Sequence, residues 1–154
     1  MDGNYQMKEI IKYYRYEYPE ISISDSVVSE IMIDVNTIVF KFDNVGFWIK
    51  NNEKDCYHRT RKSTLTLYDC DIENIDIFVL AEKNISGEKL RIKEYLVFDE
   101  FVDEINNKTM SFEIVQEYKS ERGSLVVGRI RNKNIKVDVY IQIDYKKLRF
   151  AYDE

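Results

Sequence analysis

The sequence predicts a mainly β fold, α+β by content, in which an antiparallel meander of about 8–10 strands forms a β-barrel or a sandwich. From residue 21 onward, apolar and polar residues alternate with a period of two, as they do on a strand with one buried face. Short runs rich in Val, Ile and Phe are separated by turns that contain Asp, Asn or Gly. Two helices complete the expectation, an amphipathic one near the N-terminus and a short one near residues 99–107.

The composition indicates one globular domain over residues 1–154. Hydrophobic residues make up 44% of the chain and aromatic residues 14%, which is enough for a sizeable core without disulfides or metals. The formal net charge is −5, so general affinity for nucleic acid or for an anionic membrane is disfavoured. We therefore expect no membrane association and no cofactor.

The cysteines and the N-terminus indicate a cytoplasmic protein. Cys56 and Cys70 provide neither a disulfide framework nor a zinc pair, so we expect reduced thiols. The N-terminal residues contain neither the apolar core of a signal peptide nor an apolar run of membrane length. Abundant Ile, Lys, Asn and Tyr with little Ala and Pro indicate an AT-rich genome, and we interpret the source as bacterial.

Each element follows from local periodicity. Apolar residues recur at helical spacing from Met7 to Tyr18, and Pro19 ends the pattern, so we predict a helix over 5–18 packed on the sheet. Phe98, Phe101 and Ile105 mark the short second helix. Strands are predicted at 26–34, 37–43, 46–50, 63–68, 75–81 and 89–97. A helix over 72–80 is the alternative to the fifth of these.

The C-terminal third predicts a four-stranded meander. A two-residue turn at Asn132–Lys133 places Ile130 opposite Ile135, and a second at Tyr145–Lys146 places Ile143 opposite Leu148. A three-residue turn over 121–123 would place Tyr118 opposite Val126 and Gln116 opposite Gly128. These registers put the apolar residues of all four strands on one face. A one-residue slip in any of them would turn that strand's apolar residues to water. The predicted core face holds Val126, Ile130, Ile135, Val137, Val139, Ile141, Ile143, Leu148 and Phe150.

The opposite face of this meander is the first candidate binding surface. Arg129, Lys136 and Arg149 would surround Tyr140 there, and cations interleaved with an aromatic suit an acidic protein or a single-stranded nucleic acid. An ordinary solvated face is the competing interpretation, because Glu113 would lie opposite Arg131.

A polar segment over 51–62 is the second candidate. It is longer than a hairpin needs and contains Cys56, His58, Arg59 and Arg61. One Cys and one His do not make a metal site, so we predict no metal. An exposed mobile loop is the alternative to a binding loop.

Gln116 and Gly128 form the third candidate. In the predicted register they would place a polar group and missing volume at the same point of the core. This indicates either a hydrogen-bonded structural glutamine or the floor of a pocket.

These patterns favour a non-enzymatic protein-interaction domain, and an immunity-type protein would fit the profile. Tyrosines are abundant and make good interface anchors. The chain has one histidine, no Gly-rich phosphate loop and no nucleophile motif, so catalysis is disfavoured. A small-ligand-binding β-barrel is the alternative, and single-stranded nucleic-acid binding is a weaker one. The identity of a protein partner and the oligomeric state stay open.

Overall fold

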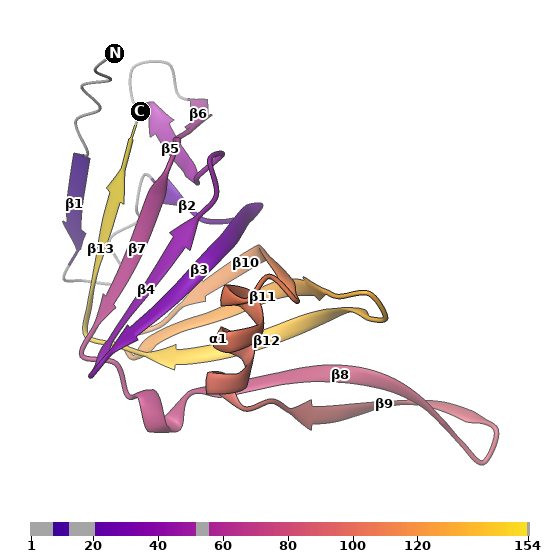
Figure 1. Ribbon diagram of the computed structural model, residues 1–154. Coiled ribbons are helices and arrows are strands. Elements are labelled where there is room, and N and C mark those ends of the chain that lie inside the picture. The colour runs from indigo at the N-terminus through magenta and orange to yellow at the C-terminus, as the bar shows by residue number, and fades with distance from the viewer. Residues whose placement is uncertain (1–7, 13–20, 52–55, 154) are drawn as a thin grey trace.

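The protein folds mainly into antiparallel strands in the computed structural model, which describes residues 8–12, 21–51 and 56–153 (Figure 1). The strands are β1 (Lys8–Lys12), β2 (Ile21–Ser22), β3 (Ser26–Asp34), β4 (Thr37–Phe42), β5 (Trp48–Asn51), β6 (Cys56–Arg59), β7 (Ser63–Tyr68), β8 (Asp76–Ile85), β9 (Glu88–Tyr95), β10 (Ser111–Lys119), β11 (Gly123–Arg131), β12 (Lys136–Asp144) and β13 (Lys147–Tyr152). The helices are a 3-10 turn, η1 (Ile72–Asn74), and α1 (Phe98–Asn106). The predicted mainly β class and the helix near 99–107 are confirmed.

Ten strands form one bent sheet in the order β1-β13-β7-β4-β3-β10-β11-β12-β8-β9, and β2-β5-β6 form a small second sheet. In Figure 1, β4 and β7 lie steeply in the view and point in opposite directions, while β8 and β12 lie nearly across it. The two halves of the large sheet meet through a short pairing of β3 with β10 over Phe112–Ile114. The described strands do not close into a barrel, because β1 and β9 remain the two ends of the sheet. The architecture is therefore sandwich-like.

The core fills the space between the two halves. Phe40, Leu65 and Phe150 face inward from one half, and Phe112 and Ile141 from the other, all of them buried. On β4 and β7 the residues alternate between buried and partly exposed, which is the two-residue periodicity seen in the sequence.

The helix α1 lies against the same core. The ring of Phe101 meets that of Phe112 edge-on, with centroids 5.3 Å apart. At the helix end, the amide of Asn106 donates from Nδ2 to the carbonyl of Ile31 and accepts at Oδ1 from its N–H, both at 2.8 Å. A short helix is marginal alone, so this docking on β3 stabilises it.

The N-terminal helix predicted over 5–18 is not supported. Residues 8–12 form β1, which pairs with β13 in the register Ile10↔Phe150. The rest of that prediction lies outside the described residues. Ile10 and Ile11 are β-branched and favour strands as much as helices, so an available sheet edge can override the helical spacing.

The four-stranded meander is also wrong, because β12 and β13 do not pair. β13 lies between β1 and β7, and five strands (β7, β4, β3, β10 and β11) separate it from β12 in the sheet order. Neither Tyr145 nor Lys146 has the positive φ that a tight hairpin turn requires. Instead the chain crosses the corner of the sandwich, where Tyr145 N donates to Arg122 O and Lys146 N to Tyr68 O.

The β11–β12 pairing differs from the predicted register by two residues. Ile130 lies opposite Val137, and the bond from Asn132 N to Ile135 O shows that the two-residue turn lies at 133–134 instead of 132–133. Because the shift is even, the predicted core face stays inward for Val126, Ile130, Val139, Ile141 and Ile143, all buried. Ile135, in the loop, is 50% exposed and does not belong to the core.

The β10–β11 pairing contains a bulge that changes which residues face the core. The predicted three-residue turn contains two residues, because Ser120 N bonds to Gly123 O. The register then shifts between Ile114 and Gln116, so the extra residue reverses the faces that follow it. As a result, Gln116 is exposed and Glu117 is largely buried.

Candidate functional site

The outer face of β12, β8 and β9 carries a continuous row of aromatic side chains. The registers place Val127 opposite Tyr140, Tyr140 opposite Phe78, and Phe78 opposite Tyr95. The rings of Phe78 and Tyr140 stack with centroids 5.0 Å apart and planes 10° from parallel. Tyr95 meets Phe78 edge-on at 6.1 Å and is 65% exposed. We call Tyr140, Phe78 and Tyr95 the aromatic row.

Cations border the aromatic row. Lys93 Nζ lies 4.1 Å from the ring centroid of Phe78 and 4.8 Å from that of Tyr95, a cation–π geometry. Arg129 forms a 3.6 Å ion pair with Asp138 on the neighbouring strand. The row therefore lies beside charged groups that water can reach.

One cross-strand pair on this face brings two like charges together. Arg131 lies directly opposite Lys136, and both are exposed. The acidic neighbour predicted for Arg131 is not there, because Glu113 lies opposite Arg129 and Ser111 lies opposite Arg131. Like charges directly opposite each other destabilise a sheet, so this pair has no structural benefit. An open groove beside it is lined by Leu80, Arg91, Arg129, Lys136, Asp138 and Tyr140.

The structure thus brings together three of the four residues of the predicted binding face. Arg129, Lys136 and Tyr140 share the outer face of β11 and β12, whereas Arg149 lies on β13 in the other half of the sheet, opposite Thr66. The sequence predicted Arg149 on this face because it predicted that β12 and β13 pair, and they do not. Phe78, Lys93 and Tyr95 were missed, because the sequence alone does not reveal that β8 and β9 lie beside β12.

The predicted binding loop is partly a strand. Residues 56–59 form β6, which pairs with β5, and residues 52–55 lie outside the described part. Cys56 and His58 are exposed. The backbone N–H of Arg61 donates to Asp153 O at 2.9 Å.

Arg59 has a structural role in this segment. Its guanidinium lies 4.2 Å from the ring centroid of Trp48 and donates to Gly46 O at 3.2 Å and to Asp25 O at 2.9 Å. These contacts tie the small sheet to the loop before β3. These two bonds and the contact with the Trp48 ring hold the guanidinium in place, so a ligand would have to compete with the fold for it.

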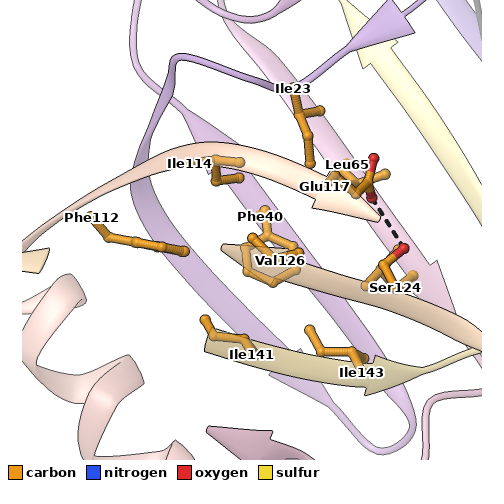
Figure 2. A pocket seen from close by; sticks show the side chains of 11 residues that line it. Ile23, Phe40, Leu65, Phe112, Ile114, Glu117, Ser124, Val126, Ile141 and Ile143 are labelled. Atoms are coloured by element: carbon orange, nitrogen blue, oxygen red, sulfur yellow. Dashed lines mark hydrogen bonds between the residues drawn. The ribbon is translucent and has the colours of Figure 1, made fainter. Parts of the chain in front are cut away.

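The predicted pocket at Gln116 and Gly128 does not form. Gln116 lies opposite Val127 and points outward, while Gly128 lies opposite Ile114. The space that Gly128 leaves is filled by Phe112, whose ring carbon lies 2.2 Å from where a Cβ would be. A cavity does lie nearby, lined by apolar residues of both sheet halves with Glu117 and Ser124 at one end (Figure 2). Its volume is about 10 Å³, roughly what one water molecule needs.

Glu117 is the charged group of this interior. Ser124 Oγ lies 3.1 Å from Glu117 Oε2 and 2.6 Å from the hydroxyl of Tyr145, and Lys119 Nζ lies 3.7 Å from Oε1. Burial raises the pKa of the Glu117 carboxyl, and Lys119 and Ser124 offset this only in part. The predicted register, with Gln116 at the core, would place its neighbour Glu117 on the outer face, since nothing in the local pattern marks the bulge that turns Glu117 inward.

Two further properties constrain the site. Among the described residues, no three His, Cys, Asp or Glu side chains are grouped so that they could hold a metal ion. No helix in the described ranges has the length and apolar character needed to cross a membrane.

In comparisons with known proteins, the chain matches no family model, no curated protein and no solved structure. Function must therefore be inferred from the surfaces themselves.

Proposed function

We propose that the chain is a non-enzymatic protein-binding domain and that its contact surface is the outer face of β11, β12, β8 and β9. The observation that carries this proposal is the aromatic row beside the like-charged pair Arg131 and Lys136. Exposed aromatic area next to cations is typical of interface hot spots, which are enriched in Tyr and Arg. A like-charged pair is easier to explain when an acidic surface binds over it.

The partner that fits this face is a protein with an acidic contact patch. Arg131 and Lys136 form no ion pair with other described residues, and Lys93 is held against rings instead of a carboxylate. Carboxylates on a partner would relieve the repulsion between Arg131 and Lys136 and speed up the encounter. Tyr95, the most exposed member of the row, would provide the apolar anchor.

A single-stranded nucleic acid fits the same face less well. Bases need open ring faces for stacking, but Phe78 and Tyr140 stack on each other and Lys93 lies over Phe78. Asp138 and Glu82 also place negative charge among the cations. A small ligand inside the sandwich gains no support, because the cavity has room for about one water molecule.

To test the proposal, the wild-type chain and two variants of the full chain are each used to capture binding proteins from native cells. The face variant carries Tyr95→Ser with Lys136→Glu, and a matched control carries Tyr57→Ser with Lys146→Glu. Tyr57 is 51% exposed and lies on β6 in the small sheet, and Lys146 is exposed at the corner of the sandwich. We expect one protein to be retained by the wild type and the control and lost by the face variant.

The affinity of the purified partner should then fall at least tenfold in the face variant. Equal binding to all three forms would overturn the proposal, and loss only in the control would assign binding to the β6 segment. Fluorescence anisotropy with single-stranded oligonucleotides at low salt tests the other class of partner. If the wild type binds oligonucleotides tightly and the face variant does not, the partner of this face is a nucleic acid and not a protein.

A further inference from the structure

Strand β9 ends the large sheet, and its outer edge pairs with no other described strand. The β8–β9 hairpin projects beyond the sandwich in Figure 1. Ile85 and Leu90, near its tip, are 47% and 41% exposed. An edge of this kind presents unpaired backbone N–H and C=O groups to which another strand can bond.

The two faces of β9 differ in chemistry. Lys89, Arg91 and Lys93 are opposite Asn84, Glu82 and Leu80 of β8, on the same face as the aromatic row. Leu90 and Ile92 alternate with them and point to the other face. The nearest carboxylate to Arg91 is that of Glu82, 3.9 Å away on the exposed surface. Such a pair is weak and can exchange for another partner.

This pattern disfavours the pairing of β9 with a second copy of itself. Two identical antiparallel strands in one sheet are related by a twofold axis perpendicular to the sheet, so residues of equal parity face each other. Lys89, Arg91 and Lys93 all have odd numbers, and every register in which most of the two strands overlap therefore brings at least one pair of these cations opposite each other. Like charges directly opposite destabilise a sheet. The edge thus repels a second copy but is open to a strand of opposite charge.

We propose that β9 binds an extended segment of a partner protein as an added strand, with acidic residues at alternate positions and apolar residues between them. The acidic residues would lie opposite Lys89, Arg91 and Lys93, and the apolar ones beside Leu90 and Ile92. This inference rests on the proposed function, since it gives the mode by which a protein partner binds next to the aromatic row.

The probe is a fluorescent peptide of alternating Glu and Val, capped at both ends. A block peptide of the same composition keeps the charge but loses the alternation, and a peptide with Lys in place of Glu reverses the charge. We expect the full chain to bind the alternating peptide at least tenfold more tightly than either control peptide. The protein variant Lys89→Glu with Lys93→Glu should weaken binding by about tenfold, since two favourable cross-strand pairs become unfavourable.

Lys62→Glu with Lys146→Glu carries the same change of charge far from β9 and should leave binding unchanged. Hydrogen exchange gives the decisive readout, because an added strand protects backbone amides of β9. Equal binding of the alternating and block peptides, or binding without β9 protection, would overturn strand addition. A native partner lost by the Tyr95 and Lys136 face variant, together with no binding of the alternating peptide, would refute this inference and leave the proposed function intact.

Discussion

The hydroxyl of Ser124 donates a 3.1 Å hydrogen bond to Oε2 of Glu117 inside an otherwise apolar interior (Figure 2). A serine hydroxyl has one proton, so the 2.6 Å contact between Ser124 and Tyr145 must be a donation from the tyrosine. The chain of donors runs from Tyr145 through Ser124 to the carboxyl. It holds Glu117 in place but does not fully replace the water that burial removes.

Glu117→Gln should make stability less dependent on pH. Burial raises the folded-state pKa of Glu117. The contribution of protonated Glu117 to the free energy of unfolding is therefore complete below the pKa that its carboxyl has in the unfolded chain. That contribution is lost as pH rises through the folded-state pKa. The wild type should therefore lose stability relative to Glu117→Gln as pH rises above the range in which carboxyl groups ordinarily titrate. Urea unfolding at several pH values measures this, with Glu121→Gln in an exposed turn as the control. Parallel curves for wild type and Glu117→Gln would contradict it.

Gly128→Ala should destabilise the protein by about 1–3 kcal/mol through overpacking. A Cβ there would lie 2.2 Å from a ring carbon of Phe112 and 2.8 Å from the carbonyl oxygen of Glu113. The double variant with Phe112→Leu removes the first clash and should lose less than the sum of the two single changes. Thermal and urea unfolding of the four proteins give the coupling energy. Strict additivity would mean that the ring does not occupy this space.

Arg59→Ala should lower the free energy of unfolding by about 1–2 kcal/mol, because it removes two hydrogen bonds to backbone carbonyls and the contact with Trp48. Arg59→Lys should not restore it, since an ammonium group lacks the planar fork. His58→Ala, one residue away and exposed, should change stability by less than about 0.5 kcal/mol. If the His58 and Arg59 variants unfold alike, the segment does not depend on the arginine contacts.

Thiol labelling should separate the two cysteines. Cys56 is exposed, whereas burial raises the pKa of Cys70 to about 12, and its Sγ donates to Leu67 O at 3.3 Å. Since the thiolate is the reactive form, iodoacetamide at pH 8 should modify Cys56 alone in the native protein. Both cysteines should react in denaturant. Intact mass and peptide mapping follow the reaction, and native labelling of Cys70 at the denatured rate would refute the burial.

Residues predicted from local alternation are mostly where the sequence placed them. The β11–β12 register moved by two residues, yet Ile130 and Val139 stayed in the core because an even shift preserves the side of the sheet. The bulge in β10 shifts the register by an odd number of residues, so Glu117 faces the core where Gln116 was predicted. A single extra residue leaves almost no trace in a hydrophobic pattern, so the burial of Glu117 could not be predicted and the pocket at Gln116 was predicted wrongly.

The pairing of strands that are far apart in the sequence was predicted less well than the buried face of each strand. Proximity in sequence suggested that β12 and β13 pair, but a short link can also cross a corner of the sandwich, and Tyr145 and Lys146 do not adopt turn geometry. Arg149 was lost from the candidate face for that reason. Phe78 and Tyr95 lie beside Tyr140 because β8 pairs with β12, although the paired residues are sixty or more positions apart in the sequence. Local periodicity carries no information over such a separation.

The position of β13 between β1 and β7 has a consequence for biosynthesis. A ribosome releases β1 and β7 long before residues 147–152 emerge, so neither strand can gain this neighbour until those residues have been made. This half of the sheet therefore stays incomplete until β13 is inserted. Exposed edges in such an intermediate are open to wrong pairing, and nascent chains that stop before Lys147 should be early substrates for chaperones or proteases.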